Sequence, residues 1–304
     1  MGELIAFIST LGFATANVLA RKAAMHSSES TSLAGSLLSS IITMAIALII
    51  YAVTLLFGQH VTLNMEGILW FAASGFLSVY VGRTFLYYSL EHLDSVSAAN
   101  IKNLSPFFTV IIAAIFLGES ITFSMVIGGI LIFTGLFMVS NKRQKASMLG
   151  VTLKKPLFIA GNIGLMYGIL SAFGYATGNS IRKQGMMVLP DPYMGAIVGS
   201  AVGILVFVVF AMFNPNYRDA FVSIRRSFQP SLFFSGVAIS AGQILFLVSL
   251  MYTGVARSTL IVSAQTILTV LISKWVFKTK EDVSKKLVFS VLCTMVGVAF
   301  IIII

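Results

Sequence analysis

Long apolar runs, separated by short charged or turn-forming segments, dominate this chain. An α-helix needs about 20 apolar residues, within a range of roughly 17–25, to cross the hydrocarbon core of a bilayer. The runs have that length and are continuously apolar, whereas membrane β-barrels are built from alternating strands of about ten residues. The pattern predicts an all-α integral membrane protein with ten transmembrane helices, at residues 4–24, 33–57, 67–90, 95–117, 121–140, 157–182, 193–213, 230–253, 257–277 and 286–304.

Composition agrees with a bilayer environment. Of the residues, 58% are hydrophobic and 10% are charged, whereas soluble domains carry roughly 25% charged residues. A water-soluble protein this apolar could not cover its surface with polar groups. The net charge of +10 comes from Lys and Arg gathered between the apolar runs, as in residues 141–145 and 278–286. Membrane topology explains that placement, so no nucleic-acid partner is expected.

Groups suited to catalysis or metal binding are sparse. Cys293 is the one cysteine and lies in an apolar run, which excludes a disulfide within the chain. The histidines are scattered in or beside expected loops, at His26, His60 and His92. We therefore expect no metal site, no cofactor and no enzymatic activity.

An internal repeat divides the chain into two halves. Residues 12–17 read GFATAN and residues 174–179 read GYATGN, an offset of 162. Further matches follow in the same order, at an offset of 160 and then again at 162, which a two-residue insertion late in the second half explains. These matches are Ser89-Leu90 with Ser249-Leu250, Thr109-Val110 with Thr269-Val270, Glu119 with Glu281, and Gly135 with Gly297. We interpret them as a duplication.

The number of spans determines how the two copies are oriented. Five spans per copy is an odd number, so the second copy is inverted in the membrane relative to the first. The expected organisation is a first five-helix repeat at residues 1–145, a basic linker at 146–156 and a second, inverted repeat at 157–304. Inverted repeats related by an axis in the membrane plane are a recurring plan of secondary transporters.

Two sequence motifs, together with the duplication, resemble a known family. Gly12 to Asn17 is followed by Arg21-Lys22, and the run Asn103-Leu104-Ser105-Pro106-Phe107-Phe108-Thr109 leads to Leu117-Gly118-Glu119. Over essentially its whole length the chain resembles the EamA branch of the drug/metabolite transporter superfamily. Since Gln265-Thr266 stands where the first half has Ser105-Pro106, the ninth span is expected to be less kinked than the fourth.

The resemblance carries expectations about architecture and activity. It implies a multi-pass protein of the cell (inner) membrane, with a central cavity lined by spans 1, 3, 4, 6, 8 and 9 and with spans 5 and 10 outside. Family members mostly export amino acids and other metabolites, and relatives carry nucleotide sugars and sugar phosphates. Small multidrug-resistance relatives use a membrane-embedded glutamate in the first helix, where this chain has Ala14, Thr15 and Asn17. Export of lipophilic cations by that mechanism is therefore disfavoured.

Two cations fall inside expected spans, Arg83 in the third and Lys102 in the fourth. A charge at a helix centre costs about 2.5–3.5 kcal/mol on insertion scales, so it usually faces the bundle interior or water. Both residues lie at similar depth on either side of the turn near residues 92–93. With Tyr80 and Tyr87 they could form a pocket for a carboxylate or phosphate. Alternatively, Lys102 extends to the interface and Arg83 pairs with Glu91.

Polar residues recur at equivalent positions of the two halves. They fit either a central hydrophilic pathway or interhelical hydrogen bonds, which are worth about 0.6 kcal/mol on average. The pairs are Asn17 with Asn179, Asn103 with Ser263, Ser105 with Gln265, and Thr109 with Thr269, and Gln243 replaces Arg83. The candidate substrate-binding set is Arg83, Lys102, Tyr80, Tyr87, Asn103, Ser105, Thr109, Asn17, Asn179, Gln243, Gln265 and Thr269.

Charge placement also predicts an orientation. Most Lys and Arg residues lie in loops after odd-numbered spans, and the opposite side has only Arg182, Lys183 and Arg257 near span ends. Positive-inside reasoning places the odd-numbered loops in the cytoplasm and both termini outside. The family resemblance implies cytoplasmic termini instead. We favour the charge count, because the N-terminus carries no Lys or Arg that would hold it inside.

The leading functional hypothesis is a secondary transporter of small polar or anionic metabolites, with amino acids first among them, working by alternating access. A sugar-phosphate or nucleotide-sugar exchanger is the alternative within transport. A channel or a non-transporting membrane scaffold is the alternative of another class. The expected partners are a small-molecule substrate and the lipid bilayer, with homodimer formation left open.

Overall fold

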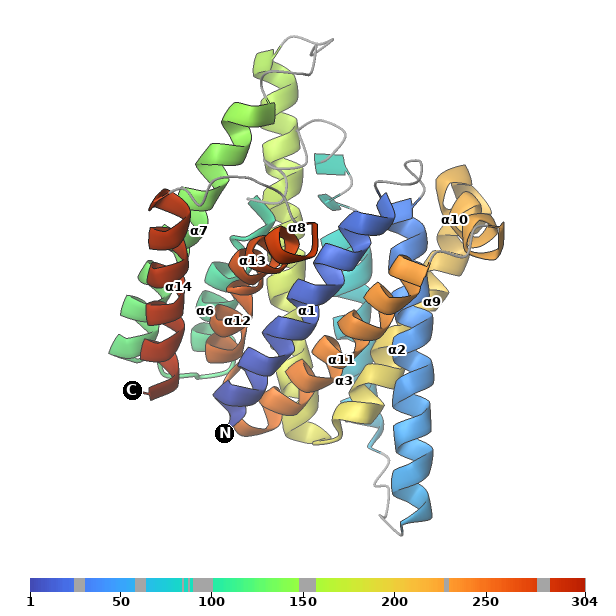
Figure 1. The fold of residues 1–304 in the computed structure, drawn as a ribbon. Coiled ribbons are helices and arrows are strands. Elements are labelled where there is room, and N and C mark those ends of the chain that lie inside the picture. The colour runs from blue at the N-terminus through green and yellow to red at the C-terminus, as the bar shows by residue number, and fades with distance from the viewer. Residues whose placement is uncertain are drawn as a thin grey trace.

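The chain folds as a bundle of helices (Figure 1). The computed structural model describes residues 1–24, 31–57, 64–83, 85–86, 88–89, 101–147, 157–226, 230–277 and 285–303. Every regular element within these ranges is helical. Both chain termini lie at one end of the bundle, which we call the terminal end (Figure 1). The end of α7 (Phe123–Ser147) and the start of α8 (Leu157–Val188) lie at the opposite end.

Six of the described helices are long and apolar enough to cross a membrane. Before α7 come α1 (Gly2–Ala24), α2 (Thr31–Leu56), α3 (Met65–Phe76), the π-helix η1 (Leu77–Arg83) and α6 (Ser105–Phe116). After α8 come α9 (Pro192–Phe213), α10 (Pro215–Arg226), α11 (Pro230–Tyr252), α12 (Val255–Ser263), α13 (Gln265–Phe277) and α14 (Lys285–Ile303). The protein is therefore a multi-pass, all-helical membrane protein in the described part of the chain.

Two close helix crossings form the centre of the bundle. α1 packs along α11, and α8 packs along α3 and η1. In the first crossing the Ser9 hydroxyl donates to the Gly242 carbonyl at 2.7 Å, and in the second the Ser171 hydroxyl donates to the Gly82 carbonyl at 2.5 Å. A Cβ at Gly12 would lie 3.0 Å from the backbone of Gly242. Small residues thus let the backbones approach, as is usual between membrane helices.

The outer helices pair at two edges of the bundle. α7 and α14 lie side by side at one edge, and α2, α9 and α10 lie at the other (Figure 1). The α7–α14 contact again uses a serine and small residues, because Ser290 donates to the Gly135 carbonyl at 2.6 Å. A Cβ at Gly297 would lie 2.6 Å from the Gly128 carbonyl oxygen.

Two helix boundaries and one additional helix differ from the sequence-based expectation. α8 extends to Val188 instead of ending at residue 182, so Arg182 and Lys183 lie within a helix and not beside a span end. α7 extends to Ser147, through the first residues of the expected linker, and residues 148–156 lie outside the described residues. α10 was not predicted; it buries Tyr217 and Ala220 and leaves Arg218 and Asp219 exposed, which makes it an amphipathic helix.

Two expected spans are interrupted near their centres. In the fourth, the Leu104 N–H donates to the Ile101 carbonyl at 3.0 Å, and in the ninth the Ala264 N–H donates to the Ile261 carbonyl at 3.1 Å. The ninth span was expected to be less kinked because it lacks a proline, yet a break lies at the equivalent position. A three-residue turn closed by backbone groups forms without proline, which explains the difference.

Candidate functional site

Lys102 is partly buried and has an aromatic partner. Its Nζ atom is 4.7 Å from the centroid of the Tyr175 ring on α8, within the range of a cation–π interaction. A Cβ at Gly82 of η1 would lie 3.1 Å from the same ring. The fourth span, η1 and α8 therefore meet at Tyr175, a residue that sequence reasoning missed.

The other residues of the expected anion pocket are only partly described. Tyr80 stacks on Phe76 and packs against Phe210 of α9, with ring centroids 5.1 and 5.2 Å away. The structure thus places Tyr80 against α9. Tyr87 and the side chain of Arg83 lie outside the described residues, so their part in the pocket stays a prediction.

The threonines of the duplicated polar pairs satisfy their hydroxyl groups locally. The Thr109 hydroxyl donates to the Ser105 carbonyl at 2.9 Å, and the Thr269 hydroxyl donates to the Gln265 carbonyl at 2.7 Å. One long contact of 3.5 Å joins the Asn17 amide to the Thr269 hydroxyl, between α1 and α13. Bonds from Ser and Thr to their own helix are common and carry no functional signal.

The amide side chains differ from the threonines. Four of them are partly buried and make no side-chain hydrogen bond to another described residue, namely Asn103, Asn179, Gln243 and Gln265. Among the described residues, the side-chain polar atoms that are fully buried without a hydrogen-bond partner are the hydroxyl oxygens of Ser78 and Thr294. The amide nitrogen and oxygen atoms of these four residues are not among them. These amides therefore retain accessible surface. Because an unpaired amide in hydrocarbon is costly, we infer that they contact water.

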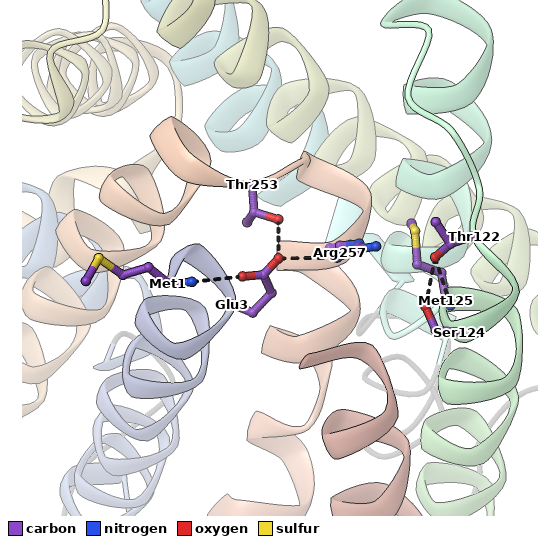
Figure 2. A network of polar contacts seen from close by, with 7 residues as sticks. All are labelled: Met1, Glu3, Thr122, Ser124, Met125, Thr253 and Arg257. Carbon is purple, nitrogen blue, oxygen red and sulfur yellow. Dashed lines mark hydrogen bonds and ion pairs between the residues drawn. The ribbon is translucent and has the colours of Figure 1, made fainter. Parts of the chain in front are cut away.

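Acidic and basic groups join α1 to α11 and α12 at the terminal end of the bundle (Figure 2). Glu3 of α1 accepts a hydrogen bond from the Thr253 hydroxyl at 3.0 Å and lies 3.4 Å from the guanidinium of Arg257. The N-terminal ammonium of Met1 lies 3.4 Å from the second carboxylate oxygen. The start of the chain is thereby tied to the α11–α12 turn.

Glu119 binds the same turn from the loop that follows α6. Its carboxylate accepts from the N–H groups of Val255 and Ala256 at 2.7 and 3.0 Å. These are the first N–H groups of α12, where the helix dipole favours negative charge. Gly118 supports this position, since its φ of 64° ends α6 in the left-handed conformation that glycine adopts without strain.

Lys183 of α8 holds the other side of the turn. Its ammonium donates to the carbonyls of Leu250 and Thr253 at 2.6 and 3.0 Å, at the C-terminal end of α11, where positive charge is favoured. We call Glu3, Glu119 and Lys183, with the turn from Leu250 to Arg257 that they bind, the terminal clasp. The sequence contained a signal for it, because Glu119 matches Glu281 and, at the same offset of 162, Lys183 matches Arg21.

Possible metal ligands do not cluster in the described part of the chain. No group of three His, Cys, Asp or Glu residues there could hold a metal ion. The three histidines lie outside the described residues, and Cys293 is a free cysteine on α14.

Comparison with known proteins identifies relatives over nearly the whole chain. The sequence model of the EamA-like transporter family matches residues 1–141 and 162–303. An uncharacterized transporter of Archaeoglobus fulgidus is 28% identical over 232 residues, which cover 71% of this chain and 82% of that protein. A solved crystal structure has a TM-score of 0.73 at 15% identity and covers 98% of this chain and 95% of its own. That last likeness shows the fold alone.

Replacing Glu119 with Gln should loosen the α11–α12 turn, because a neutral amide keeps the shape of the carboxylate but accepts more weakly. Hydrogen bonds to charged groups contribute about 1.5–3 kcal/mol, so the thermal unfolding midpoint of the purified protein in detergent should fall. Asp219→Asn is the control, since Asp219 is an exposed carboxylate on α10. Equal midpoints for E119Q and the unmodified protein would contradict the role of Glu119 in the clasp.

Proposed function

Because the chain belongs to the EamA-like transporter family, a branch of the drug/metabolite transporter superfamily, we propose that it is a secondary transporter of small polar or anionic metabolites in the cell membrane. Amino acids are the first substrate class to test, and sugar phosphates or nucleotide sugars are the second. The family points to transport and not to catalysis.

The observation that carries this proposal is the set of unpaired amides within the bundle. Asn103, Asn179, Gln243 and Gln265 come from four expected spans of both halves and are partly buried without a protein partner among the described residues. A membrane scaffold would satisfy such groups internally, since nothing in lipid can do so. A polar pathway that carries hydrated solute keeps them available.

We further propose the ten-span architecture of two inverted repeats. The two central crossings support it, because Ser9 and Ser171 are 162 positions apart while their acceptors Gly82 and Gly242 are 160 apart, the offsets of the sequence repeat. The family model also matches two stretches of nearly equal length. Two such halves give inward-open and outward-open states of similar energy.

In this scheme the terminal clasp acts as a closure. Glu3 and Glu119 belong to the first half, and the turn that they bind belongs to the second. Opening the pathway at the terminal end requires these contacts to break. In this scheme, contacts that form at the opposite end offset the free-energy cost of breaking them. The clasp thereby contributes to the energy difference between the two states.

Counterflow in proteoliposomes tests the transport proposal. A carrier reorients faster when loaded, so unlabelled substrate inside the vesicles should accelerate uptake of labelled substrate. A channel would show uptake without this trans-stimulation. Neither uptake nor exchange of amino acids, sugar phosphates or other organic anions would contradict the transport proposal.

The ten-span proposal predicts that residue 148 and the C-terminus lie on opposite sides of the membrane. Reporter fusions at the two positions should identify residue 148 as cytoplasmic and the C-terminus as external, following the charge count. The same compartment for both would rule out five spans per half. Opposite compartments with the C-terminus inside would keep the architecture and reverse the orientation.

Removing the charge of Lys102 should weaken substrate binding if this ammonium contacts the anionic part of the substrate. Lys102→Met keeps the length of the side chain and is expected to reduce apparent affinity about ten- to a hundredfold, the equivalent of one charge-assisted hydrogen bond. Arg83→Gln is the partner variant for the third span. Unchanged transport in both variants would exclude the predicted anion pocket at these two residues.

A further inference from the structure

A partly buried guanidinium group lies where α8 packs against α3, at Arg182 of α8. α8 runs antiparallel to α3 and η1, and small residues mark the levels at which the helices touch, with Gly67 against Leu189, Gly185 against Phe71, and Gly174 against Gly82. Between the Gly185–Phe71 and Gly174–Gly82 contacts, the Nε atom of Arg182 donates to the Ser74 hydroxyl at 3.2 Å. On α8 itself, Arg182 is six residues from the last helical residue, Val188. At about 1.5 Å per residue that is roughly 9 Å inside the end of the helix.

Arg182 has few partners for a charged group at this depth. Among the described residues it makes no ion pair within 4.0 Å, and the Ser74 bond is its one side-chain hydrogen bond. Its terminal nitrogens are not among the buried atoms that lack a partner, so they keep accessible surface. A charge inside a membrane normally faces the bundle interior or a water-filled cavity. The free donors of Arg182 therefore face water or a solute.

The neighbours of Arg182 along α8 identify the direction in which it faces. Tyr175, Asn179 and Arg182 are spaced four and three residues apart and share one stripe of the helix. Gly178, on one side of this stripe, faces Ser78 of η1, and Lys183, on the other side, binds the end of α11. The stripe thus faces the interior between η1 and α11. Lys102 lies over Tyr175 at its far end.

The charges along this stripe have one sign. The described acidic residues lie near helix ends or in α10, as Glu3, Glu66, Glu119, Asp191 and Asp219. Two of these carboxylates are already bound to helix N-terminal N–H groups, Glu119 at α12 and Asp191 at α9. The described part of the interior thus offers cationic and amide donors to a solute and no carboxylate to an ammonium group.

We propose that Arg182 and Asn179 form an anion subsite of the transport pathway, which binds the carboxylate or phosphate of the substrate and favours organic anions over zwitterions. This inference rests on the proposed transport function and narrows its substrate class, because it places sugar phosphates and other organic anions ahead of amino acids. A guanidinium presents parallel N–H donors that fit two oxygens of a carboxylate or phosphate. Asn179, one helical turn away, adds an amide donor, and Lys102 provides a second cation for a dianion.

The competing explanation is that Arg182 only ties α8 to α3 through Ser74. In that case R182Q and S74A would lower the thermal midpoint of the unliganded protein by similar amounts, and neither would change the affinity for a solute. The anion subsite predicts a different pattern. R182Q should change affinity, whereas S74A removes the tie and leaves the guanidinium in place.

The test uses the full chain, purified and reconstituted, with succinate, glucose 6-phosphate, alanine and glucose as probes. Thermal shift in detergent gives binding, and counterflow in vesicles gives transport. We expect succinate or glucose 6-phosphate to bind and exchange, with alanine and glucose weaker. R182Q should lower the affinity for that anion about ten- to a hundredfold. R182K should fall between, because it keeps the charge and loses the fork.

Two further variants keep the test decisive if R182Q does not fold. N179A removes one donor and should lower the affinity for the same anion by roughly two- to tenfold, the value of an ordinary hydrogen bond. R218Q is the matched control, since Arg218 is an exposed arginine on α10, and should bind and exchange as the unmodified protein does.

The outcomes separate the two proposals. Exchange of alanine or glucose in preference to both anions would overturn the anion subsite and leave the transport function standing. Anion exchange with unchanged affinity in R182Q, or in N179A where R182Q does not fold, would overturn the assignment of these residues. No exchange of any probe would count against both proposals.

Discussion

The hydrogen bond between a serine hydroxyl and a glycine carbonyl of the facing helix is the contact on which this bundle depends. Ser9 with Gly242 and Ser171 with Gly82 hold the central crossings, and Ser290 with Gly135 holds the outer one. Hydrophobic burial does little to drive helix association within lipid, so close packing and buried hydrogen bonds must hold the bundle together. Each such bond needs a backbone without a side chain at the crossing. The glycines therefore determine which helices meet.

The same constraint explains where charge occurs. Lipid cannot solvate an ion, so each described charge on the inner helices must find a helix end, a hydroxyl, an aromatic ring or water. Glu119 and Lys183 use the free N–H and carbonyl groups at two helix ends that face each other. Arg182, one residue away from Lys183, uses a single hydroxyl and has donors to spare. Two adjacent residues of α8 thus differ in role. Lys183 makes a structural contact with α11, whereas Arg182 keeps N–H donors that can bind a solute.

Much of the helical architecture follows from the sequence, because bilayer thickness dictates the length of an apolar run. α9 and α11 begin and end within one residue of the expected spans. The expectation failed at α8, where Arg182 and Lys183 look like an end signal. They remain helical because Ser74 and the end of α11 bind their side chains. These partners lie 67 to 108 positions away in sequence, so local sequence signals did not reveal them. Lys102 was singled out because the cost of burying a charge can be judged from the sequence around it. Its contact with Tyr175 depends on how two helices pack, so Tyr175 was missed.

Residues that do not recur in the other copy of the repeat are candidates for solute binding, whereas residues that recur in both copies are candidates for helix packing. At an offset of 162, Lys183 corresponds to Arg21, and both are basic, but Arg182 corresponds to Ala20. At an offset of 160, Ser74 corresponds to Phe234. The basic position of the clasp thus recurs at the matching sequence position of both halves, which fits the proposed exchange between two equivalent states. Arg182 has no basic counterpart in the first half, so it is not part of the repeated packing. In the proposed alternating pathway, such a group would bind the solute in one orientation while the helices around it exchange roles.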